Sequence, residues 1–157
     1  MNIKVAFYRG HGNTVNRIVR WWTKSPYSHA ELIMPDGVTW IGISPKGSRL
    51  TSRIRETYIP TEWDFIELEV TTEQIAVIKE FFSATENCLY DWTGMILSQF
   101  LPFHIKRKGK WYCSEWIAYA LRISCVIDWR LIKIYDRADL SPAVLYQIIK
   151  ASQNKKV

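Results

Sequence analysis

Cys113 is the residue of this chain whose type and position most clearly suit covalent chemistry. It opens the segment C-S-E-W-I-A-Y-A-L, whose apolar residues recur at helical spacing. The first turn of a helix favours a thiolate, because its free N–H groups and the positive end of the helix dipole stabilise negative charge. The same N–H groups can hold an oxyanion. Cys113 is therefore a candidate nucleophile.

The alternative interpretation is that Cys113 is a small, buried and inert core residue. Ile117, Ala120 and Leu121 follow it at core spacing. Lys108 and Lys110 would favour the thiolate, and Glu115 would oppose it unless it caps or pairs. Cys88 and Cys125 have no such setting, so we expect both to be buried and inert.

A histidine and a glutamate form the second candidate group. Residues 27–34, Y-S-H-A-E-L-I-M, and 38–44, V-T-W-I-G-I-S, flank a Pro-Asp-Gly turn and predict a β-hairpin. Alternation puts one apolar set on the buried face, namely Ala30, Leu32 and Met34. Tyr27, His29 and Glu31 then share the other face. Residues two apart on a strand lie about 7 Å apart at Cα, so Glu31 can orient the His29 imidazole and stabilise its cation.

Periodicity, capping residues and turn residues predict the other elements. Strands are expected at 3–8 and 63–70, and residues 45–62 and 106–110 are expected to be loops. Helices are expected at 14–24, from the Thr71–Gln74 capping box to 84, within 90–101, at 113–123 and at 142–151. Residues 126–134 are ambiguous, with a strand as one alternative. The predicted class is α+β, a small antiparallel sheet packed with helices.

Length and composition predict one globular domain over residues 1–157. The chain is 48% hydrophobic and 23% charged, and it shows no repeat or low-complexity linker. Its 8 tryptophans suit either a cleft or partner surface, or simply the core. The net charge of +6 favours an anionic partner, but the excess is scattered and no nucleic-acid-binding motif is present. We therefore expect no specific nucleic-acid partner.

The remaining sequence signals concern compartment and cofactors. Three cysteines without a C-x-x-C pair predict a reducing compartment and no disulfide framework. Arg9 interrupts the N-terminus too early for a signal peptide, and the apolar stretch at 95–103 is too short to span a bilayer. A cytoplasmic protein is expected, or a virion-associated or injected one if a phage encodes it. His11 and His104 lack ligand-spaced partners, so no metal and no cofactor are expected.

Three motifs, in this order, resemble a known superfamily. They are Y-S-H-A-E-L at 27–32, Y-D-W-T-G-M at 90–95 and W-Y-C-S-E-W at 111–116. Together they look like the permuted branch of the NlpC-type papain-like superfamily, which holds the YiiX-like amidases and peptidases and, more distantly, lecithin:retinol acyltransferase. I-S-P-K-G-S-R at 43–49 and S-P-A-V-L-Y at 141–146 resemble segments of small phage-borne members. The resemblance implies a circularly permuted papain-like fold.

The resemblance also implies roles for individual residues. Cys113 matches the nucleophile and His29 the general base. Tyr90 lines the substrate site or assists the oxyanion hole. The orienting residue is Glu31, with Ser44 on the following strand as the alternative, because relatives often carry it there. Tyr27, Tyr90 and Ser44 are the candidate substrate-binding residues.

The function implied is acyl transfer by a cysteine amidase or peptidase, acting on a peptide such as that of a cell wall. Two alternatives stay open. One is a lipid acyltransferase or thioesterase that meets an acyl chain through residues 95–103. The other is a non-catalytic binding module that keeps the fold and binds through its tryptophans and positive charge.

Overall fold

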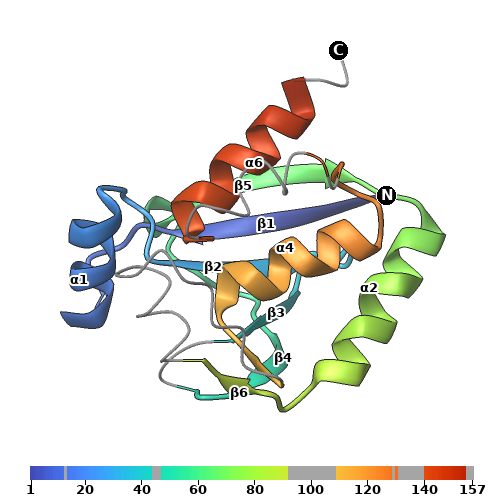
Figure 1. Cartoon of the computed structure of the whole chain (residues 1–157), viewed down its shortest axis with the longest axis horizontal. Coiled ribbons are helices and arrows are strands. Elements are labelled where there is room, and N and C mark those ends of the chain that lie inside the picture. Colours follow the sequence, from blue (N-terminus) through green and yellow to red (C-terminus); the bar gives the residue numbers. More distant parts are fainter. Residues whose placement is uncertain (13, 44–46, 92–108, 129, 131–139, 155–157) are drawn as a thin grey trace.

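The central strand of the sheet, β1 (Asn2–Tyr8), alternates side chains between two covered faces. The computed structural model describes residues 1–12, 14–43, 47–91, 109–128, 130 and 140–154. β1 pairs antiparallel with β2 (His29–Ile33) on one side and with β5 (Trp63–Glu69) on the other. β3 (Thr39–Ile43) pairs with β2, and β4 (Leu50–Ile54) pairs with β3, so the order is β4-β3-β2-β1-β5 (Figure 1). The predicted α+β class, with a small antiparallel sheet and helices, is confirmed.

The strand β4 corrects the prediction of a loop over residues 45–62. Among the described strands it is an edge strand paired with β3, and of its residues only Leu50 is buried. An edge strand with solvent on its outer side needs little apolar character, so hydrophobic periodicity does not reveal it. The short 3-10 helix η1 (Pro60–Glu62) follows in the same segment.

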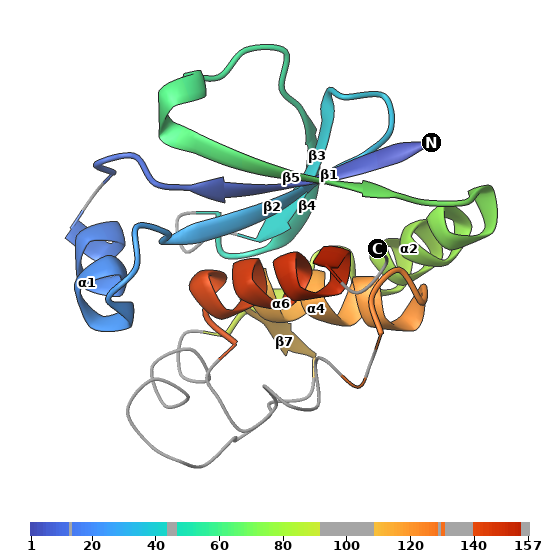
Figure 2. The same cartoon turned by 90° about the horizontal axis from the view of Figure 1, so that it is seen from above.

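One face of the sheet is covered by helices. Figure 2 shows α4 (Cys113–Ile123) and α6 (Pro142–Asn154) beneath this face, with α2 (Thr72–Thr85) beside them and α1 (Thr14–Thr23) at one end. The main core fills the space between sheet and helices. Its fully buried members include Val5, Phe7, Leu32, Ile78, Trp116, Leu121 and Leu145.

The opposite face carries a smaller aromatic cluster around two tryptophans. Trp40 and Trp63 pack edge to face with ring centroids 5.2 Å apart. The Arg55 guanidinium lies 4.6 Å from the Trp40 ring centroid, and the Tyr58 ring covers the same tryptophan. The connection between β4 and β5, which includes η1, thus lies over this face, where no α-helix of the described residues packs (Figure 2).

A second, two-stranded sheet leads into α4. β6 (Leu89–Tyr90) pairs in parallel with β7 (Lys110–Trp111), with Tyr90 opposite Trp111. Because Trp111 stands two residues before Cys113, this pairing brings Tyr90 close to the start of α4. Neither short strand was predicted, since two residues are too few to show a period.

The predicted strands at 3–8 and 63–70, the hairpin and the helices at 14–24, 71–84, 113–123 and 142–151 are all confirmed within a few residues. Val126 and Ile127 are buried but form no strand. The remainder of the ambiguous segment, at 129 and 131–139, lies outside the described residues. So do most of the helix predicted within 90–101, the 95–103 stretch and residues 106–108 of the predicted loop.

The capping box of α2 gives a direct test of the fold's local determinants. The Thr71 hydroxyl accepts the Gln74 N–H at 3.3 Å, and the Gln74 side chain accepts the Thr71 N–H at 3.0 Å. We expect Thr71→Ala to lower the free energy of unfolding by about 1 kcal/mol, because it removes the cap acceptor. Thr72→Ala, at the exposed next position, is the matched control for denaturant unfolding. Equal losses in both variants would contradict the prediction.

Candidate active site

The first turn of α4 holds Cys113 against strand β2. Tyr112 caps the helix in an extended conformation, φ −111° and ψ 164°, so Cys113 is its first helical residue, as predicted. The next residue anchors the turn, because the Ser114 hydroxyl donates to the carbonyl of Leu140, two residues before α6 begins. Cys113 is buried, with 5% of its surface exposed.

The sulfur sits where strands β2 and β3 separate. Their ladder contains the pairs Leu32–Ile41 and Ile33–Trp40, so the first three residues of β2 lie outside it. The backbone N–H groups of Ala30 and Ser114 both act on the Cys113 sulfur and lower its pKa. Two backbone donors therefore converge on the sulfur and favour its ionised form.

The His29 imidazole joins Cys113 to Glu31. Its Nε2 lies 3.0 Å from Glu31 Oε1, which confirms that residues two apart on this strand meet. The Cys113 thiol also lies close enough to the ring for each group to shift the other's pKa, a proximity that the sequence itself could not predict. An imidazole has two ring nitrogens, so one serves each partner. Only 13% of the His29 side chain and 2% of the Glu31 side chain are exposed.

Electrostatics in this group favour a thiolate–imidazolium pair. Burial by itself would raise the pKa of Cys113, but the His29 cation and the N–H donors outweigh it and lower that pKa. Burial would likewise lower the pKa of His29, yet Cys113 and Glu31 raise it to about 10. The pKa of Glu31 is lowered, since His29 and two arginines offset its burial. The charged form of each group is stabilised by its neighbours.

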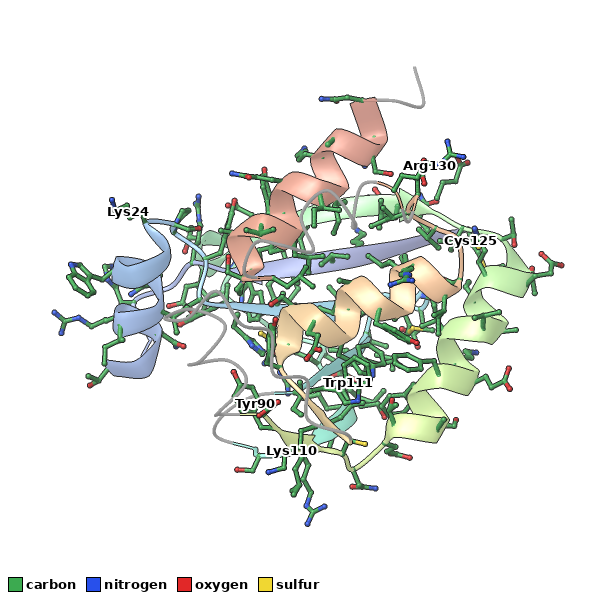
Figure 3. The ribbon with its side chains drawn as sticks, viewed as in Figure 1. Lys24, Tyr90, Lys110, Trp111, Cys125 and Arg130 are labelled. Atoms are coloured by element: carbon green, nitrogen blue, oxygen red, sulfur yellow. The ribbon has the colours of Figure 1, made fainter. Side chains whose placement is uncertain are left out.

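Tyr90 lies near Cys113, because its partner Trp111 stands two residues before the cysteine. It is buried, and burial together with the nearby Cys113 raises the pKa of its hydroxyl well above the usual value. The phenol therefore stays protonated at neutral pH. Figure 3 shows Tyr90 beneath the N-terminal end of α4.

Tyr27 does not share a face with Glu31, so that expectation was wrong. β2 begins only at His29, and the alternation does not extend back to residue 27. Tyr27 packs in the helix-facing core, 5.4 Å from the Phe7 ring, and donates to Asp64 at 2.8 Å. Its substrate-binding role is left without support from this placement. Ser44 lies outside the described residues.

Two residues that sequence reasoning missed complete the surroundings of Glu31. Arg53 forms an ion pair with Glu31 Oε1, the same oxygen that meets His29. Gly42 lies across from Glu31, and a Cβ there would come within 2.9 Å of the Glu31 Cγ. Arg53 belongs to the segment predicted as a loop, and nothing in the sequence pairs a lone glycine with a glutamate.

The other cysteines and histidines take no part in the contacts around Cys113 that the structure describes. Cys88 is half-buried, and Cys125 is exposed at the far end of α4 (Figure 3), which corrects the expectation that both are buried. His11 is exposed, and His104 lies outside the described residues. Within the described ranges, no three His, Cys, Asp or Glu side chains gather as metal ligands. Nor does any described helix combine the length and apolarity needed to cross a membrane.

The lowered pKa of Cys113 predicts its reactivity. We expect iodoacetamide to alkylate Cys113 well below pH 8.5, the region where a free thiol ionises. In His29→Ala the cation is lost while burial stays, so the midpoint should move above that of a free thiol. The rate is measured per cysteine by peptide mass from pH 4 to 10, with the exposed Cys125 as internal control. Matching profiles for Cys113 and Cys125 would exclude an activated pair.

The contact between Gly42 and Glu31 makes a second prediction. In Gly42→Ala the added methyl overlaps the Glu31 side chain, and we expect a loss of about 1–3 kcal/mol in the free energy of unfolding. The displaced carboxylate should also raise the midpoint pH of Cys113 alkylation. Gly37→Ala is the comparison for a glycine change in the same hairpin, since no atom lies within 4 Å of a Cβ there, although its φ of +76° adds strain. A normal alkylation profile in Gly42→Ala would show that the contact does not position Glu31.

Comparison with known proteins adds no assignment to this geometry. The sequence matches no protein-family model, and no curated protein is significantly similar to it. A function for the chain therefore has to be argued from its own residues.

Proposed function

We propose that this protein is a cysteine hydrolase of the amidase or peptidase type, working through a covalent acyl-enzyme. The observation that carries the proposal is the buried chain of contacts from the Cys113 thiol through His29 to Glu31. A nucleophile, a base and a group that orients the base are the parts that covalent acyl transfer requires. A buried structural cysteine needs none of them.

The position of Cys113 supports the same reaction. As the first residue of α4, it carries a backbone N–H that has no acceptor within the helix. When the sulfur attacks a carbonyl, the oxyanion that forms can accept a hydrogen bond from that N–H. The helix dipole also favours the negative charge. The protonated Tyr90 hydroxyl beside Cys113 is a candidate second donor.

The proposed reaction has two halves. The Cys113 thiolate attacks the carbonyl carbon of an amide or ester, and the carbonyl electrons move to the oxygen as an oxyanion. His29 gives its proton to the leaving amine or alcohol as the tetrahedral intermediate collapses to a thioester. Water, deprotonated by His29, then attacks the thioester, and the acid product leaves as the thiolate and imidazolium are restored.

The charge of the chain favours one class of substrate. The net charge of +6 suits an anionic polymer such as a cell wall, and an amide substrate would then be a wall peptide. The lipid alternative relied on residues 95–103, which lie outside the described residues. No placement in the described part favours it over the amidase.

An activated ester tests the proposed chemistry without knowledge of the natural substrate. We expect p-nitrophenyl acetate to give a burst of nitrophenol close to one per chain and to leave an acetyl group on Cys113 by peptide mass. His29→Ala should slow the burst by roughly 10²–10⁴-fold, the usual contribution of a general base. Cys125→Ser should behave as wild type, because Cys125 is exposed and distant from the site.

Two outcomes would count against the proposal. One is a burst that survives in Cys113→Ala, which would place the reactive group elsewhere. The other is a Cys113 thiolate that alkylates readily but is never acylated by ester, thioester or amide probes. The second outcome would favour a binding module that retains the fold. Release of new amines from purified wall peptide, compared with release of fatty acid from acyl esters, then separates the two enzyme classes.

A further inference from the structure

Glu31 is the most deeply buried charge near Cys113, with 1% of its surface exposed. A carboxylate in such a place is stable only if opposite charges and hydrogen bonds replace its lost hydration. His29 alone does not supply a constant positive charge to Glu31, because it becomes neutral whenever it gives up a proton. A permanent cation is needed to keep Glu31 ionised while His29 is neutral.

The neighbouring strands show which group supplies that cation. Opposite Glu31, β1 presents Ala6 and β3 presents Gly42, and neither can titrate. From its own strand His29 faces it, and Cys113 of α4 lies beyond His29. The permanent charges are Arg53 of β4, in an ion pair, and Arg55, which acts from a greater distance.

Arg53 reaches Glu31 across an intervening strand. β3 lies between β4 and β2, and Arg53 pairs with Trp40 while Thr51 pairs with Gly42. Side chains at 53, 42 and 31 therefore share one face of the sheet. Since Gly42 has no side chain, the Glu31 side chain occupies the space over it, and the Arg53 guanidinium meets Glu31 Oε1 on that same face.

Both partners of Glu31 use a single oxygen. Nε2 of His29 and Nη2 of Arg53 meet Oε1, and within the described residues Oε2 is buried without a hydrogen-bond partner. The carboxylate is thus held by one atom between a proton-exchanging group and a fixed cation. Arg55 is engaged differently, lying 4.6 Å and 5.2 Å from the ring centroids of Trp40 and Trp63.

We propose that Arg53 is a positioning residue of the Cys113–His29–Glu31 site, which holds the Glu31 carboxylate ionised and aimed at His29. The inference rests on the proposed function only in assuming that the Cys113–His29 pair is active. Arg53 acts through Glu31 rather than on the reacting atoms. Its loss should let Glu31 take up a proton at acid pH, after which His29 loses its counter-charge and Cys113 its thiolate.

The test is the midpoint pH of Cys113 alkylation by iodoacetamide in the full chain. We expect Arg53→Met to raise that midpoint by about half a unit or more. Arg53→Lys should restore most of the shift, because it keeps the positive charge. Arg122→Met is the control for net charge, since Arg122 is exposed in the last turn of α4, away from Cys113. It should leave the midpoint where it is in wild type.

A double variant separates positioning from a general effect of charge or folding. If Arg53 works through Glu31, then Arg53→Met should cause no further shift in a Glu31→Gln background. An equal shift in both backgrounds, or none in Arg53→Met alone, would overturn the proposal. Thermal unfolding of each variant identifies any that fail to fold. If Arg53→Met fails to fold, Arg53→Lys still tests the proposal. If the alkylation midpoints shift as expected but the protein does not turn over esters, the result counts against the hydrolase proposal and not against the role of Arg53.

Discussion

The site depends on the mutual neutralisation of charges that the fold removes from water. Cys113, His29 and Glu31 are each largely buried, and each would favour its neutral form if it stood alone. Placed in a row, they stabilise one another's ionised forms, so that negative, positive and negative charges alternate. Because breaking a buried charge pair is costly, the strands and helix that carry these residues are tied to a single arrangement.

The separation of β2 from β3 is what makes room for this arrangement. A complete ladder would use the Ala30 N–H for β3 and would leave the Cys113 sulfur only the N–H of Ser114 from the helix. Ending the ladder at Leu32 exposes the Ala30 N–H at the point where α4 begins. The sheet thereby contributes a hydrogen bond as well as the two side chains of the candidate triad, while the helix contributes the sulfur and its terminal N–H groups.

The two faces of the sheet have different tasks. The helix-facing side is a conventional apolar core, with residues such as Phe7, Leu32 and Trp116 fully buried. The other side carries the Arg53–Glu31 ion pair, beside the Trp40–Trp63 cluster. His29, at the start of β2, stands where the two meet. It can contact Glu31 and also the sulfur on the helix side, since its ring has two nitrogens.

Much of the fold could be predicted from the sequence because its signals are local. Alternation identified the strand at 3–8, a Pro-Asp-Gly turn identified the hairpin, and the Thr71–Gln74 box marked the start of α2. The strand β4 escaped because an edge strand needs few apolar residues. The start of α4 at Cys113 and the contact between His29 and Glu31 were also predictable, since both follow from spacing within one element.

What the sequence by itself determined are the components: a cysteine at a helix start and a histidine–glutamate pair on a strand. Only the tertiary structure decided that Cys113 meets His29, that Tyr90 lies beside the sulfur while Tyr27 packs elsewhere, and that Arg53 reaches Glu31. The physical reason is the range of the interactions. Capping and alternation act within a few residues, whereas these contacts depend on how strands β2, β3 and β4 and helix α4 pack around one shared core.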